Sequence, residues 1–214
     1  NTIKGMKRLV GLPFADPRAQ KEMLHLPGVT FVEIPHASGG ATVGVSVKGL
    51  AQPLPVAAVA GMMVHHMGTI AASKAAEQSD TSVEKVFPQD WVVAIPNYYD
   101  AAQRRALQAG CEMVGLGIQR FVHENTATAL SYGMFKDLKK EFTKDKPTNV
   151  MFIDMGASAY TVCIASFEPG QCKVKAAYCD PDLGGRDFDA VIANYLAEKF
   201  EEKFKIHARL LQNG

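Results

Sequence analysis

Cysteine is scarce in this sequence, and no two cysteines are spaced as a C-x-x-C pair. The four residues are Cys111, Cys163, Cys172 and Cys179. Without such a pair, the sequence gives no indication of a structural zinc site or a dithiol redox motif. Sparse thiols are typical of a reducing compartment, so we expect a cytoplasmic protein whose cysteines act as small buried hydrophobic residues.

The sequence also lacks an excess of one charge and a long uninterrupted apolar run. The formal net charge is +1, so nothing favours nucleic acid or an anionic membrane as a partner. No run reaches the roughly 18 apolar residues of a membrane span, and we expect none. Residues 1–11 have no signal-peptide layout and the chain begins with Asn1, so we expect a piece of a longer protein.

The 214 residues, 47% of them hydrophobic, suffice for one large domain or two small ones. Residues 1–10 predict a short helix capped by Asn1, and Asp16-Pro17 predicts a second helix start. Alternating β-branched residues predict a hairpin from residues 30–35 and 41–47, with its turn at 37–40.

A long amphipathic helix is expected over residues 53–79. Its apolar residues recur at spacings of three and four, which predicts a face turned to the core rather than a groove for a partner. These residues are Val56, Val59, Met63, Met67 and Ile70.

The following section has the pattern strand, helix, strand, helix. Residues 91–95 (WVVAI) form a continuous apolar run, as expected for a strand covered on both faces. Asp100 caps a helix that extends to about residue 114, and a strand at 118–122 precedes a helix at 126–134. This order implies a parallel sheet with right-handed crossovers.

A lysine-rich stretch, 135–148, is expected to be a solvated connection, although a basic binding patch is the alternative. Three strands then form a meander over residues 150–179. A helix over 187–204 follows, with six apolar residues expected to face inward. These are Phe188, Val191, Ile192, Tyr195, Leu196 and Phe200.

Joined head to tail, βαβα and βββα are the end of one ribonuclease-H-like repeat and the start of another. We therefore predict a partial α/β actin-like ATPase fold that spans parts of both lobes. The predicted divisions are a helical and β insert of the first lobe (1–89), the end of that lobe's sheet (90–147) and the start of the second lobe (148–214).

Three bends carry residues suited to a phosphate and a divalent cation. In MFIDMGASAYTV, Asp154 ends a strand that we expect to be buried, and Gly156 follows, so backbone N–H groups could approach phosphate oxygens. DLGGRDFD leads two glycines into a helix, whose N-terminus favours anions. Glu124 lies between a strand and a helix. An ordinary turn, a plain helix start and a capping glutamate are the alternatives.

The adjacent Lys7 and Arg8 are expected to point to different sides, one toward a cleft and the other toward solvent. A surface lysine is the alternative. The neighbouring His65 and His66 diverge by about 100° on a helix, so we assign no metal to them.

Two long segments resemble the nucleotide-binding domain of the 70-kDa heat-shock-protein superfamily. They are VVAIPNYYDAAQRRALQAG, from Val92, and HENTATALSYG, from His123. GGRDFD (184–189) and IDMGASAYTV (153–162) are similar to the large 110-kDa class of that superfamily.

The resemblance implies roles for individual residues. Lys7 would reach the γ-phosphate and the attacking water, while Glu124 and Asp154 would hold hydrated magnesium. Backbone groups of the bend after Asp154 and of the two glycines before the last helix would line the phosphates of ATP or ADP. Two further residues would relay the nucleotide state to a substrate-binding domain. The phosphate-lining residues are Gly156, Ala157, Ser158, Gly184 and Gly185, and the relay residues are Pro96 and Arg104.

The sequence departs from the 70-kDa pattern at several of these positions. Ala157 and Ser158 replace glycines, Ala159 replaces a threonine, Thr161 replaces an aspartate near the metal, and Asn125 replaces a proline. A lost carboxylate removes general-base help that is typically worth about 10²–10⁴-fold, so we expect slow hydrolysis at most.

By this resemblance the parent protein is an ATP-binding co-chaperone. It would speed nucleotide exchange on a 70-kDa partner and hold unfolded polypeptides through domains outside this chain. An active 70-kDa ATPase and, further off, a sugar kinase are the alternatives. The chain alone is expected to bind little ATP and to have open sheet edges that favour self-association.

Overall fold

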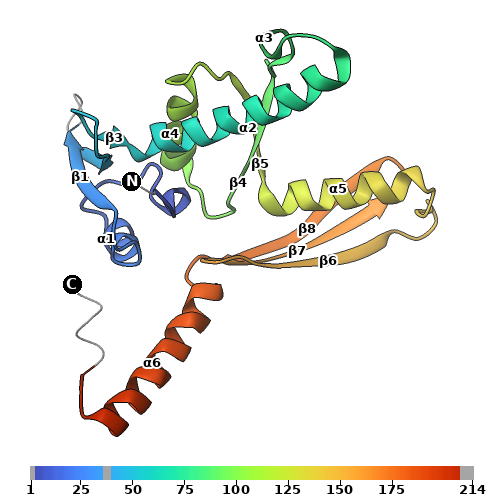
Figure 1. The fold of residues 1–214 in the computed structure, drawn as a ribbon. Helices are drawn as coiled ribbons and strands as arrows, with labels where there is room; N and C mark the ends of the chain where they lie inside the picture. Colours follow the sequence, from blue (N-terminus) through green and yellow to red (C-terminus); the bar gives the residue numbers. More distant parts are fainter. Residues whose placement is uncertain (1–2, 36–39, 208–214) are drawn as a thin grey trace. The chain divides into compact units, whose positions relative to one another are not determined.

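The computed structural model describes residues 3–35 and 40–207, and these form two compact units (Figure 1). The first unit comprises residues 1–95 and 99–122, and the second comprises residues 96–98 and 123–214. Asn1 and most of the expected hairpin turn, residues 37–39, lie outside the described residues. The three-part division at residues 89 and 147 stays a prediction.

The first unit begins with short elements around a three-stranded sheet. A 3₁₀ turn, η1 (Met6–Arg8), replaces the expected helix and is followed by α1 (Pro17–Leu24). The predicted hairpin is confirmed, because β1 (Thr30–Pro35) pairs antiparallel with β2 (Ala41–Ser46). A short strand, β3 (Leu54–Pro55), completes the sheet on the other side of β2.

Two helices of the first unit pack with their backbones in close contact. They are α2 (Val56–Ser79) and α4 (Ala101–Glu112), with α3 (Val83–Val86) between them in the chain. A Cβ added at Gly61 of α2 would lie 2.1 Å from the carbonyl oxygen of Gly110, and one at Gly110 would lie 2.0 Å from that of Ala57. Only glycine fits at this crossing.

The predicted core face of α2 is wrong over most of its length. Val56 and Val59 are buried, but Met67 is 67% exposed, and Met63 and Ile70 are exposed too. The buried face consists instead of small residues, because small side chains allow close approach to α4 and to Trp91. After Val59 these are Gly61, Gly68, Ala72 and Ala76.

By length and composition α2 is apolar enough to cross a membrane, although polar residues interrupt its apolar run, and this corrects the expectation that no segment qualifies. A packed helix of a protein interior passes the same test. The glycine contact with α4 and the packing of Gly68 against the Trp91 ring are features of a packed helix.

The strands β4 (Trp91–Ile95) and β5 (Ile118–His123) form a separate two-stranded sheet. The run WVVAI predicted a strand covered on both faces, and this is wrong. Burial alternates along β4, with Val92 and Ala94 exposed and Ile95 buried. In this chain only one face of β4 is covered.

In the second unit, α5 (Glu124–Leu138) packs on a three-stranded antiparallel meander, as Figure 1 shows. Its strands are β6 (Thr148–Met155), β7 (Tyr160–Glu168) and β8 (Gln171–Asp180). The core between helix and sheet is aromatic. Phe167 is 1% exposed and stacks on Phe142 with ring centroids 5.2 Å apart. Because Phe142 is buried, the stretch 135–148, which we expected to be a solvated connection, is not solvated along its whole length.

The last helix, α6 (Gly185–Phe204), buries no residue, which contradicts the expected inward face. All six residues predicted to point inward are exposed. The sheet face opposite α5 is exposed as well, including Met151, Ile153 and Tyr178, so β6 is not the buried strand that the sequence indicated.

Candidate functional site

The segments that carry Glu124, Asp154 and Gly185 are connected by direct contacts within the second unit. Glu124 is the first residue of α5, directly after β5. Its neighbour Asn125 accepts a hydrogen bond at 2.9 Å from the hydroxyl of Thr161 on β7. Thr161 is the register partner of Asp154 on β6. The start of α5 is thereby fixed beside the end of β6.

The turn between β6 and β7 holds the start of α6. The N–H of Gly185 donates to the carbonyl oxygen of Gly156, and the N–H of Arg186 donates to that of Ala157, both at 2.9 Å. A Cβ at Gly184 would lie 2.6 Å from backbone atoms of Ala157 and Ser158, so glycine is required there. The two motifs, far apart in the sequence, form one backbone junction.

This junction uses N–H groups that we expected to face phosphate. The N–H of Gly184 donates to the carboxylate of Asp187 at 2.7 Å, and that of Gly156 donates to the carbonyl oxygen of Ala159 at 2.9 Å. Gly156, Gly184 and Gly185 therefore donate to protein acceptors here. Ala157 and Ser158 lie at the tip of the turn, and the phosphate-lining roles of all five residues stay predictions.

Two positions that depart from the 70-kDa pattern are bonded to each other. Asn125 and Thr161 are both buried, and the hydroxyl-to-amide bond joins them. The Nδ2 of Asn125 is also buried and has no hydrogen-bond partner among the described residues. A buried unpaired donor in a native structure calls for a partner such as water or a ligand.

Lys7 belongs to the first unit and lies in η1. Lys7 is exposed, while Met6, Leu9 and Val10 around it are buried. Arg8 points elsewhere, because its Nε pairs with the buried carboxylate of Glu22 on α1 at 2.7 Å. Lys7 is thus exposed while Arg8 is engaged in a largely buried ion pair, and the expected placement of one of the two toward a cleft stays a prediction.

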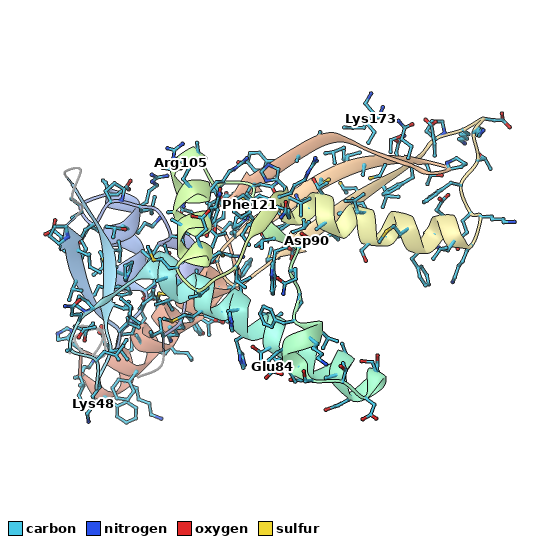
Figure 2. The ribbon with its side chains drawn as sticks, turned by 90° about the horizontal axis from the view of Figure 1, so that it is seen from above. Lys48, Glu84, Asp90, Arg105, Phe121 and Lys173 are labelled. Carbon is cyan, nitrogen blue, oxygen red and sulfur yellow. The ribbon has the colours of Figure 1, made fainter. Side chains whose placement is uncertain are left out.

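The predicted relay residues flank the start of α4. Pro96 directly follows β4 and is buried. Arg104 lies in the first turns of α4, next to Arg105, which is labelled in Figure 2. Its Nε donates to the carbonyl oxygen of Tyr99 at 3.2 Å. The relay roles of both residues stay predictions.

Sequence reasoning missed Tyr99 and Gln103, whose side chains contact the segment of Lys7. The sequence did contain a signal for Gln103, because Asp100 and Gln103 have the spacing of a capping box. The structure contains both hydrogen bonds of this capping box. Tyr99 had none, because it contacts a residue 92 positions away along the chain.

The structure also contains a hollow in the first unit and buried thiols in both units. The largest described hollow, of about 470 Å³, lies in the first unit beside Gly11 and α4. Burial raises the pKa of the Cys111 and Cys163 thiols, so both favour the neutral form that suits a packed small side chain. Among the described residues no group of three or more metal-ligating side chains gathers.

Comparison with known proteins identifies the family. The family model for the Hsp70 protein matches residues 1–212. The chain is 38% identical to human "Heat shock 70 kDa protein 4L" over 212 residues, which is 98% of this chain and 23% of that protein. It is 35% identical over 207 residues to "Heat shock 70 kDa protein 16" of Arabidopsis thaliana and to "Heat shock 70 kDa protein 4" of Rattus norvegicus. That match covers 96% of this chain, 25% of the first and 23% of the second.

The chain thus spans about a quarter of the length of the curated relatives it matches. The match over nearly the whole chain confirms both the predicted actin-like ATPase fold and the resemblance to the 110-kDa class. The chain belongs to the Hsp70 protein family.

Proposed function

We propose that this chain is part of the ATP-binding domain of a 110-kDa-class chaperone. The observation that carries the proposal is the contact network that joins the starts of α5 and α6 to the end of β6. It connects the segments of Glu124, Asp154 and Gly185, which the family resemblance assigns to one magnesium–nucleotide site.

The residues in this network fit a hydrated magnesium ion and a phosphate. Magnesium prefers oxygen ligands and keeps several waters, which Glu124 and Asp154 could hold through their carboxylates. The buried Nδ2 of Asn125, adjacent to Glu124, adds a donor that lacks a partner. The family resemblance assigns Ala157 and Ser158, at the tip of the turn, to the phosphates, and Lys7 would supply a cation to the γ-phosphate. Bound magnesium would neutralise the phosphate charge.

The same network supports slow hydrolysis. At position 161 a threonine hydroxyl donates to Asn125, so this position offers an attacking water no carboxylate that could accept its proton. General-base assistance is worth about 10²–10⁴-fold, which sets the size of the expected deficit. We infer that the full-length protein holds unfolded chains and speeds nucleotide release from a 70-kDa partner, and that rapid turnover is not its main activity.

The test uses the full-length protein that contains this chain and a 70-kDa chaperone as partner. We expect slow ATP turnover by the protein itself and faster release of labelled ADP from the partner. Rapid turnover without any effect on the partner would contradict the proposal and favour an active 70-kDa ATPase. Phosphorylation of a sugar panel would favour a kinase.

For the 214-residue chain alone, we expect little or no heat on titration with Mg-ATP. The chain spans only about a quarter of the length of the relatives it matches. The N–H groups of Gly156, Gly184 and Gly185, which were expected to face phosphate, also donate to protein acceptors. Micromolar binding in a calorimeter would show that the described residues suffice for the site.

A further inference from the structure

The backbone of η1 lies in the interior of the first unit while the Lys7 side chain remains outside. Met6, Leu9 and Val10 are buried, and the N–H groups of Leu9 and Val10 both donate to the carbonyl oxygen of Met6. A 3₁₀ turn of three residues has little stability of its own. Its position must therefore be set by the elements around it.

The start of α4 supplies two side chains that hold this turn. The hydroxyl of Tyr99 donates to the carbonyl oxygen of Lys7 at 2.5 Å, and Tyr99 is 4% exposed. The Nε2 of Gln103 donates to the carbonyl oxygen of Val10 at 3.2 Å, and Gln103 is 2% exposed. Buried hydrogen bonds of this kind are costly to break, because the carbonyl oxygen would be left without a partner.

Gln103 is itself fixed by the cap of α4. Its Oε1 accepts from the N–H of Asp100 at 3.3 Å, and its own N–H donates to the carboxylate of Asp100 at 2.9 Å. One buried amide thus caps the helix with its oxygen and holds the Lys7 segment with its nitrogen. Gly11 permits this approach, since a Cβ there would lie 2.5 Å from the Gln103 Cα.

We propose that Tyr99 and Gln103 are positioning residues for Lys7. They fix the backbone at the lysine itself and three residues after it, at residues 7 and 10, while Lys7 remains exposed. This inference rests on the proposed role of Lys7 at the γ-phosphate. A lysine has four rotatable side-chain bonds, so a fixed backbone is what limits where its ammonium group can reach.

The first measurement is hydrogen exchange of residues 6–10 in the 214-residue chain. Tyr99→Phe removes the hydroxyl and keeps the ring, and Tyr178→Phe on the exposed face of β8 is the matched control. We expect the exchange of Leu9 and Val10 to accelerate about fivefold to tenfold in Tyr99→Phe only. Equal exchange in the two variants and the unaltered chain would overturn the proposal.

The second measurement is steady-state ATP hydrolysis by the full-length protein over a range of ATP concentrations. We expect Tyr99→Phe to lower kcat severalfold with KM unchanged, and Lys7→Met to lower kcat further. If Lys7→Met reduces turnover and Tyr99→Phe does not, the turn is only structural and the positioning role is wrong. If Lys7→Met changes nothing, the proposed role of Lys7 fails, whatever the exchange data show.

Discussion

The long helices α2 and α6 have similar apolar patterns, yet they differ in what they bury. From α2, seven residues are buried, and its face toward α4 approaches so closely that two glycines are required. From α6, none is buried, although it carries as many large apolar side chains as α2. Apolar periodicity therefore identifies a face that is able to pack. Whether the face is covered depends on which neighbouring elements the chain contains.

The largest effect is expected in the core that lies on the covered side of the second unit. Phe167→Ala removes the ring that contacts Phe142, Tyr132 and Phe152, and we expect the free energy of unfolding to fall by about 3–5 kcal/mol. Hydrogen exchange of β6–β8 measures this loss. Ile164→Ala on the exposed face of the same strand is the control and should cost much less. Equal losses would show that the outer face is packed too.

The next effect tests the glycine crossing of α2 and α4. Gly61→Ala places a methyl group against the Gly110 carbonyl, so we expect a loss of about 1–3 kcal/mol in the first unit. The fluorescence of the single tryptophan, Trp91, reports on this unit because its ring packs against Gly68 of α2. Gly117→Ala, where a Cβ meets open space, should leave the transition unchanged. A stable Gly61→Ala would mean that the helices separate at little cost.

A third test compares helix starts, because α1 uses a side-chain cap where α6 uses a backbone junction. The Asp16 carboxylate accepts from the N–H of Arg18 at 2.8 Å, so Asp16→Ala should cost about 1 kcal/mol at neutral pH. The side-chain hydrogen bond from Arg18 lowers the pKa of Asp16 below its ordinary value of 3.8. The stabilisation is therefore present above about pH 4 and disappears as the pH falls through the lower folded pKa.

Urea titrations of the unaltered chain and Asp16→Ala at several pH values measure this dependence. The two stabilities should converge at acid pH. Asp145→Ala, in the exposed stretch before β6, is the control and should have no comparable effect. A difference that persists undiminished well below pH 3.8 would contradict the assignment of the cap.

The smallest effect is expected on α6. Ile192→Ala should change the free energy of unfolding by less than about 0.5 kcal/mol, because Ile192 is exposed in this chain. Val59→Ala, at a buried position of α2, is the matched comparison and should cost clearly more. A large effect of Ile192→Ala, dependent on protein concentration, would show that α6 is covered by a second copy.

Much of the fold followed from local signals in the sequence. Asp16, Asp100 and the alternation in residues 30–35 and 41–47 act within a few residues, and the predicted helix starts and hairpin are confirmed. Burial was harder to predict, because it depends on partners distant in the sequence. Met63 and Met67 fit a core stripe, but the crossing with α4 selects the glycine face instead.

In the candidate site, too, local motifs could be predicted from the sequence, whereas contacts between distant residues could not. Motif order and family resemblance pointed to Glu124, Asp154 and the glycines at 184–185, and the structure links their segments through Asn125, Thr161 and Gly156. Nothing local indicated that the Gly185 N–H would bond the Gly156 carbonyl, since the two residues are separated by the whole of β7 and β8. Tyr99 was missed for the same reason.

The bond between Asn125 and Thr161 limits how this sequence could change during evolution. Replacing either partner alone would leave a second buried polar group unpaired, at a cost of about 1–3 kcal/mol, whereas changing both could be nearly neutral. Such epistasis makes each single step toward the proline and aspartate of the 70-kDa pattern unfavourable. A lineage that acquired this pair would tend to keep it.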